Sequence, residues 1–228
     1  MRISIYLLSF LIFIAACKKE DPGPLHYFVL PADSDCAPVL LDSFPLTQGH
    51  VWIYDSGDTM RTLADTIING SKTTKLCIGQ GANLVNYHLK NASDGFWNLA
   101  FPLDSATPRN AGLSAYLYDM NSVGNSLNAV PIRLMKFPIV LNDTFSSGEN
   151  YFGEYYQSQW ITFKRITTVA GTFDCAVLKV QSSGAQSWYR YYSTKGLVRE
   201  ISVVTFGSKA KDDPGFYYST TDLISINF

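Results

Sequence analysis

The chain has 228 residues, of which 46% are hydrophobic and only 16% are charged, and its formal net charge is −1. The 18 basic residues are scattered along the sequence, so no basic stripe could track a phosphate backbone and nucleic-acid binding is excluded. The apolar content excludes a disordered chain, and the single long apolar stretch excludes a polytopic membrane protein.

Residues 1–16 are typical of an export signal. Arg2 supplies a positive charge, and the apolar run at residues 3–14 is shorter than the roughly 20 residues of a membrane-spanning helix. Ala15 and Ala16 then precede Cys17. A cysteine directly after two small residues at this point resembles the bacterial lipobox. The resemblance implies cleavage before Cys17 and acylation of its thiol.

Two acyl chains are enough for stable membrane anchoring, so we expect a lipid-anchored protein of the outer membrane, on its periplasmic or cell-surface face. Prolines and aspartates recur in the segment that follows the cysteine and disfavour a helix there. Residues 17–43 are therefore predicted to be a lipidated N-terminus and tether. Residues 44–228 are predicted to form a single β-rich domain.

From Phe44 onward, short runs rich in β-branched and aromatic residues alternate with turn residues every 8–12 positions or so, which is typical of antiparallel sheets. Hairpin chemistry is present at Asn69-Gly70, where both residues tolerate a positive φ. Similar turn signals lie at residues 93–95, 182–184 and 212–215. The predicted strands are residues 50–55, 61–68, 73–78, 84–90, 95–100, 160–169, 173–181, 187–192, 197–206 and 216–226.

The predicted fold class is all-β and mainly antiparallel, a curved sheet or half-barrel with little helix. Helix is expected to be scarce because the chain contains 15 Asp against 4 Glu, a bias away from helix formers. Residues 105–124 are the one stretch where a helical turn or a long loop is expected.

Three segments together resemble β-rich lipoproteins of unknown function from Bacteroidota. They are residues 44–52 (FPLTQGHVW), 170–175 (AGTFDC) and 188–199 (WYRYYSTKGLVR). The resemblance covers most of residues 44–206, although Lys195 stands where a glycine is usual. It implies a curved antiparallel sheet like the half-barrels of lipoprotein carriers, and it brings no catalytic residue.

No motif for a metal, a cofactor or catalysis is present in the sequence. His26, His50 and His88 are far apart, and the sequence has no nucleophile elbow and no phosphate-binding loop. Glu149 and Glu154 are the only notable pair of glutamates, but five residues apart on a strand they face opposite sides. We therefore predict no metal, no cofactor and no enzymatic activity.

With Cys17 acylated, three cysteines remain, so at most one internal disulfide can form. Export to an oxidising compartment permits such a bond. A Cys36–Cys77 bridge is preferred because Cys175 lies in an apolar strand, where a buried inert thiol is expected. The other pairings stay open.

Aromatic residues are the most informative surplus, with 14 Tyr, 14 Phe and 4 Trp. On a strand, Trp188, Arg190 and Tyr192 share one face, while Tyr189 and Tyr191 share the other. Two aromatic faces indicate that the second face is covered or lines a cavity. Trp188, Arg190 and Tyr192 are accordingly the candidate ligand-binding residues, and the alternative is that these rings only fill the core.

Exported proteins of Bacteroidota are often O-glycosylated at a Ser or Thr that follows Asp. The sequence offers Thr59, Thr66 and Ser105 as candidates of this kind.

These observations favour non-catalytic binding of a lipid, a glycan or a partner protein at the cell envelope. A structural or assembly component of an outer-membrane complex is the alternative, and a hydrolase is the third class. An interior packed without a cleft would count against a small ligand, because a ligand pocket needs room.

Overall fold

The computed structural model describes residues 28–80, 83–100, 131–149, 155–184, 186–205 and 216–228. The export signal, Cys17 and Ser105 lie outside these residues, as do the predicted loop at 105–124 and the turn at 212–215. Within the described residues the chain is built from β-strands and turns, without helix. Accordingly, no helix of this part of the chain could span a bilayer.

The strands are β1 (Ser34–Asp35), β2 (Val51–Tyr54), β3 (Thr59–Ile68), β4 (Ser71–Gln80), β5 (Asn83–Ala92), β6 (Gly95–Ala100), β7 (Ile132–Lys136), β8 (Thr144–Glu149), β9 (Tyr155–Thr168), β10 (Gly171–Ser182), β11 (Gln186–Ser193), β12 (Gly196–Thr205) and β13 (Phe216–Ile226).

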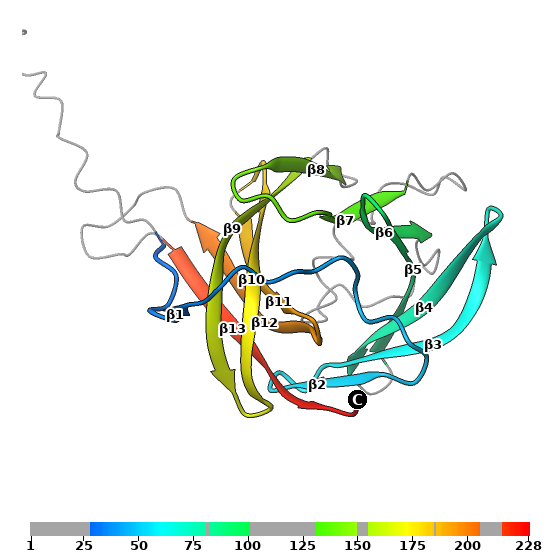
Figure 1. Ribbon diagram of the computed structural model, residues 1–228, viewed down its shortest axis with the longest axis horizontal. Coiled ribbons are helices and arrows are strands. Elements are labelled where there is room, and N and C mark those ends of the chain that lie inside the picture. The colour runs from blue at the N-terminus through cyan, green and yellow to red at the C-terminus, as the bar shows by residue number, and fades with distance from the viewer. Residues whose placement is uncertain (1–27, 81–82, 101–130, 150–154, 185, 206–215) are drawn as a thin grey trace, which may run out of the picture.

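These strands form one curved antiparallel sheet, in the order β1-β9-β10-β11-β12-β13-β2-β3-β4-β5-β6-β7, with β8 also paired to β9. The sheet curls so that β9 and β10 face β4 and β5 across an interior (Figure 1). No pairing among the described strands joins β7 to β8 or β1, so the sheet is not closed. The predicted all-β, curved-sheet fold is therefore confirmed.

The ten predicted strands correspond to β2–β6 and β9–β13, and β6 and β13 have the predicted bounds. Asn69 and Gly70 have φ values of 49° and 75°, as a tight hairpin between β3 and β4 requires. The short strands β1, β7 and β8 were not predicted.

Residues 28–36 are not a free tether, and this corrects the predicted boundary at residue 44. The Phe28 ring packs on Tyr189, Phe216 and Tyr218, with centroid distances of 5.2–5.6 Å. Further along, the Asp33 carboxylate lies 3.4 Å from the Arg199 guanidinium. These residues, which we call the N-terminal strap, are therefore part of the domain.

The strap then joins the sheet, and the chain that follows the strap crosses the end of the sheet. Asp35 pairs with Lys164, both as β1 against β9 and through an ion pair of 2.8 Å. The chain next runs across the open end of the curved sheet, from β1 towards β2 (Figure 1). Prolines are compatible with such an extended path, because they remove hydrogen-bond donors without preventing side-chain contacts. For this reason a proline-rich composition alone could not distinguish a tether from a strap.

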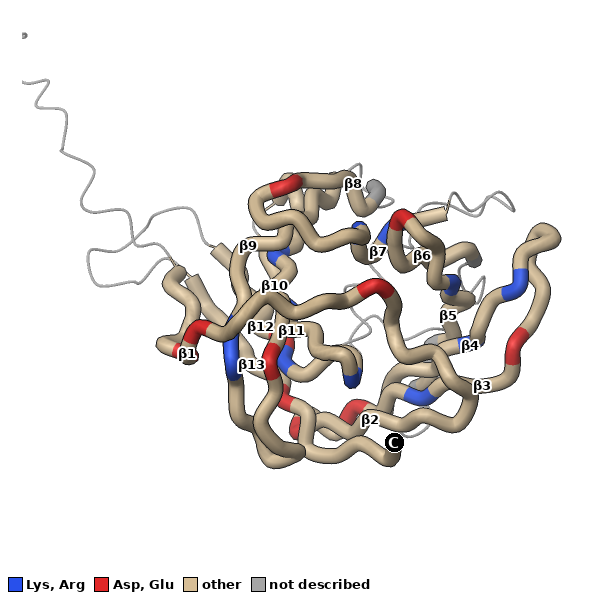
Figure 2. The backbone as a smooth tube through the Cα atoms, viewed as in Figure 1, with Lys and Arg blue, Asp and Glu red and all other residues tan. Residues whose placement is uncertain are grey.

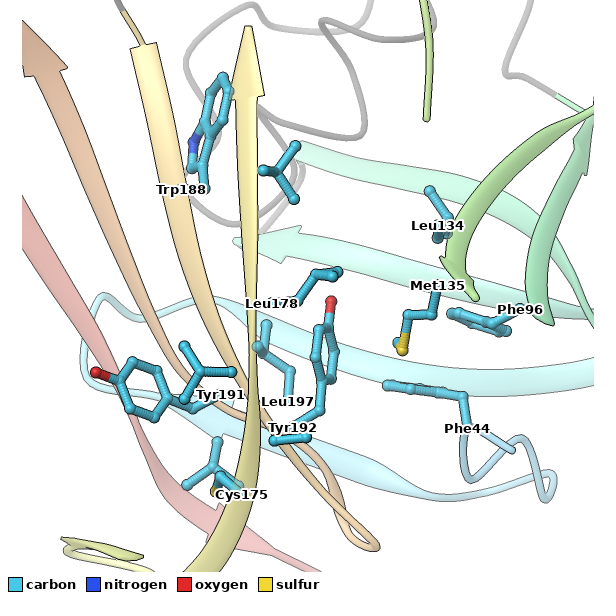
Figure 3. Packing of buried hydrophobic residues seen from close by; sticks show 14 of the residues in the cluster. Phe44, Phe96, Leu134, Met135, Cys175, Leu178, Trp188, Tyr191, Tyr192 and Leu197 are labelled. Atoms are coloured by element: carbon cyan, nitrogen blue, oxygen red, sulfur yellow. The ribbon is translucent and has the colours of Figure 1, made fainter. Parts of the chain in front are cut away.

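Phe44 ends this crossing and links the two sides of the interior. Its ring stacks on Phe96 of β6 at 4.8 Å, and it lies 5.7 Å from Trp52 of β2 and 6.3 Å from Tyr192 of β11. Met135 of β7 and Leu178 of β10 extend the same apolar cluster (Figure 3). The Phe-Pro-Leu motif therefore supplies a central core residue.

Charged residues of both signs are interspersed over the molecule (Figure 2). Several of them form ion pairs across neighbouring strands, such as Arg165 with Asp174 at 2.6 Å and Lys72 with Asp65 at 2.7 Å. The charge is therefore balanced locally.

Phe44→Ala should lower the free energy of unfolding by about 3–5 kcal/mol, because it removes a buried ring that touches both sides of the interior. Urea denaturation would measure this loss. Val140→Ala, at a side chain that is 52% exposed, is the control and should change stability by less than about 0.5 kcal/mol. Equal stability of the Phe44 variant and the parent would contradict this account of the core.

Candidate functional site

The structure places Trp188, Arg190 and Tyr192 on the inner face of β11, as the two-residue period predicts. All three are buried, with exposed fractions of 3%, 4% and 6%. Tyr192 points into the interior, while Tyr191 points away from it (Figure 3). A ligand could reach these side chains only if the core opened. Their predicted role in ligand binding is therefore corrected to a role in packing.

The size of the interior cavity supports this correction. The cavity beside Arg190 and Tyr192 has a volume of about 40 Å³. Ligand pockets for small molecules usually measure about 300–1,000 Å³. This cavity, as the described residues line it, therefore has no room for an acyl chain or a sugar.

A buried ion pair joins β11 to β12 inside this core. Arg190 Nε donates to Glu200 Oε2 at 2.6 Å, and both side chains are almost fully buried. Burial raises the pKa of Glu200, and the neighbouring Arg190 opposes that shift. Burial likewise raises the pKa of Tyr54 and of Tyr192. The pair is thus held in an apolar environment where each charge depends on the other.

The second aromatic face of β11 is covered, as predicted, and the strap is what covers it. Tyr189 lies under Phe28, and Tyr191 lies 5.8 Å from the Arg199 guanidinium that binds Asp33. Burial raises the pKa of Tyr191 well above its ordinary value. The aromatic residues of β11 therefore pack on both faces of the sheet.

The predicted Cys36–Cys77 disulfide is not formed, because Cys36, Cys77 and Cys175 are free thiols. The Cys36 amide donates to the Phe163 carbonyl on β9, whereas Cys77 is buried in β4 on another part of the sheet. The sequence could not show that the strap carries Cys36 to β9. Cys175 is fully buried and burial raises its pKa, which fits the inert thiol expected there.

The structure separates the candidate glycosylation sites. Asp58, which precedes Thr59, is fully buried. Asp65, which precedes Thr66, is exposed on β3 and pairs with Lys72. Glycosylation therefore stays a prediction for Thr66, while the burial of Asp58 counts against Thr59.

No group of three or more potential metal ligands occurs among the described residues. His50 stacks on the Phe228 ring at 3.6 Å, and burial lowers the pKa of His88. Both histidines are therefore accounted for by packing.

An open groove of about 380 Å³ lies where β8, β9 and β10 run side by side. The sheet register places Ser146 opposite Gln157, and Gln157 opposite Gln181, in a row across three strands. Side chains alternate along a strand, so this row lies on the outer face, away from the buried Val180. The lining residues are Ser146, Tyr155, Tyr156, Gln157, Gln181, Ser182 and Ser183.

The groove presents neutral polar groups beside an exposed ring. Gln157 and Gln181 are exposed, and neither amide has a hydrogen-bond partner within the described residues. Each amide can donate and accept at the same time. The Tyr155 side chain is 62% exposed, and its backbone is held by two hydrogen bonds with Ser183, at 2.8 and 3.1 Å. The groove can therefore offer fixed hydrogen-bonding groups next to an aromatic surface.

Sequence reasoning missed this groove. The available signal was the polar alternation Tyr155, Gln157, Gln159 on one face of a strand whose other face is apolar. Such alternation is ordinary for a solvated sheet face. Only the register with β8 and β10 shows that the amides gather in one place.

Replacement of Arg190 alone should be far more harmful than replacement of the whole ion pair. Arg190→Met should lower the free energy of unfolding by about 3–5 kcal/mol near neutral pH, because it leaves a buried carboxylate without its partner. Arg190→Met/Glu200→Leu should recover most of that loss. Urea denaturation of the parent, the two single variants and the double variant would measure the coupling.

The pH dependence of the Arg190 variant provides a further check. Without Arg190, Glu200 keeps its proton in the folded state to a higher pH than in the unfolded chain. The unfolded state therefore loses its proton first, above about pH 4.3, and stability falls as the pH rises. The loss should be smaller at pH 5 than at pH 7.5, and a loss independent of pH would contradict the buried pair.

No protein-family model matches the chain, and no curated protein matches it significantly in sequence. Among solved structures, the chain is similar to a Bacteroides fragilis protein named as exported and as having a YmcC-like fold, with 12% identity and a TM-score of 0.46 over 81% of this chain and 98% of that one. It is also similar to a Parabacteroides distasonis protein named as a lipoprotein, with 16% identity and a TM-score of 0.44 over 84% of this chain and all of that one.

Proposed function

We propose that this protein is an outer-membrane lipoprotein, anchored through acylated Cys17, that binds a neutral glycan in the groove formed by β8, β9 and β10. In this proposal the protein binds the glycan and does not catalyse a reaction on it. The anchor is inferred from the order of the apolar run, Ala15, Ala16 and Cys17.

The observation that carries the glycan proposal is that two glutamine amides without hydrogen-bond partners among the described residues line the same groove as an exposed tyrosine. Sugar hydroxyls both donate and accept hydrogen bonds, and the Gln157 and Gln181 amides can satisfy both roles. The C–H face of a sugar ring packs on an aromatic ring such as that of Tyr155. The volume of about 380 Å³ lies within the range of ligand pockets.

The same groove argues against the other ligand classes. A lipid would need an apolar tunnel, and the interior cavity of about 40 Å³ provides none. A hydrolase would need acidic or nucleophilic groups with perturbed pKa values, and the described lining consists of serine, tyrosine and glutamine. A neutral glycan is the class that fits the lining chemistry.

Binding to an array of neutral and acidic oligosaccharides, followed by calorimetric titration of the best neutral glycan, would test the proposal. The mature chain in detergent should bind neutral glycans. Gln157→Ala and Gln181→Ala should each weaken binding by about tenfold, because a glycan hydroxyl loses its partner. Tyr155→Ala should weaken it similarly through loss of the stacking surface.

Gln159→Ala is the matched control. Gln159 is the next outward glutamine of β9, but its amide already donates to the Asn142 carbonyl at 3.1 Å. Its replacement should leave glycan affinity unchanged. Binding restricted to acidic glycans, an absence of binding, or equal effects of the three glutamine variants would reject the groove as a neutral glycan site.

A further inference from the structure

Exposed hydrophobic side chains gather where the chain enters the domain. Phe28 is seated on Tyr189, Phe216 and Tyr218 on the outer face of the sheet. Around this contact, Val29 is 79% exposed, and Tyr218, which shares a face of β13 with Phe216, is 63% exposed. We call these two side chains the entry surface.

The anchor and the entry surface are close along the chain. Phe28 follows Cys17 by eleven residues, which can span at most about 40 Å when fully extended. The strap cannot lengthen this reach while Asp33 is bound to Arg199 and Asp35 to Lys164. An acyl chain on Cys17 therefore keeps the entry surface within about 40 Å of the membrane surface.

The chemistry of the entry surface fits the membrane interface better than open water. Tyrosine is enriched at the level of lipid head groups, since its ring is apolar and its hydroxyl can still reach water. Val29, which follows Phe28 in the chain, adds a purely apolar group to this surface. For exposed side chains of this kind on a short tether, the bilayer is an apolar partner within reach.

We propose that Val29 and Tyr218 contact the interface of the bilayer that holds the acylated Cys17. The contact fixes the orientation of the domain, so that β13 and the strap lie towards the membrane. This proposal rests on the anchor of the proposed function, and it is independent of the glycan.

Tryptophan reporters would test the contact. Tyr218→Trp and Val29→Trp would be introduced separately into the full acylated protein, reconstituted into phosphatidylcholine vesicles brominated near the head-group end of the acyl chains. Ile67→Trp is the matched control, because Ile67 is 73% exposed in β3. The β3–β4 hairpin lies on the other side of the molecule from β1 (Figure 1). Fluorescence of the parent protein would be subtracted in each case.

Both reporters near the strap should be quenched at least twofold more than the Ile67 reporter. Two reporters are used because Tyr218 also touches Phe28, whereas Val29 is a highly exposed aliphatic side chain and keeps the test valid if the Tyr218 variant misfolds. Equal quenching of all three positions, or quenching of none, would overturn the proposal.

Flotation of the vesicles separates this test from the anchor itself. The acylated protein should float with vesicles, and the Cys17→Ser protein should show at least a tenfold loss of flotation. Protein that floats without selective quenching would overturn the entry surface and leave the anchor standing. Protein that fails to float would overturn both.

Discussion

The contact of Trp52 with the β11–β12 hairpin holds the two halves of the sheet together. Only three residue pairs join β13 to β2, and their register is irregular, so backbone pairing alone holds this junction weakly. Trp52 Nε1 donates to the Lys195 carbonyl at 2.6 Å, and the Tyr54 hydroxyl donates to the Leu197 carbonyl at 2.9 Å. At Gly196, where φ is +98°, an added Cβ would lie 2.9 Å from the Trp52 indole nitrogen. Glycine at this position is therefore what allows the indole to approach.

A second tryptophan has the corresponding role at the opposite side of the interior. Trp160 of β9 donates from Nε1 to the Lys136 carbonyl at the end of β7, at 3.0 Å. Its own carbonyl accepts from the Asn142 amide at 2.8 Å. A buried indole needs a partner for its N–H group. These two hydrogen bonds of Trp160 join β9 to the end of β7 and to the β7–β8 connection. They stabilise the curvature of the sheet, although no pairing among the described strands joins β7 to β8 or β1.

The sequence was sufficient for ten of the thirteen described strands, because alternation and hairpin residues are local signals. It was not sufficient for the strap, whose contacts join Asp33 to Arg199 across 166 positions. The same limit applies to the candidate site. The sequence predicts a ligand site at Trp188, Arg190 and Tyr192 because they are aromatic or charged. In the structure, however, Arg190 pairs with Glu200 in the core. Glutamines that look ordinary in sequence form the groove, because register between distant segments brings them together.

The register also places the groove and the entry surface on one face of the sheet. Gln181 is opposite Ser187, Ser187 is opposite Val203, and Val203 is opposite Tyr218. Residues directly opposite each other share a face, so Gln181 and Tyr218 both point outward, three strands apart or about 14 Å along the sheet. A bilayer in contact with Tyr218 would therefore have the groove beside it rather than on the far side of the domain. Under the two proposals together, the glycan best placed to enter the groove is one carried by the same membrane.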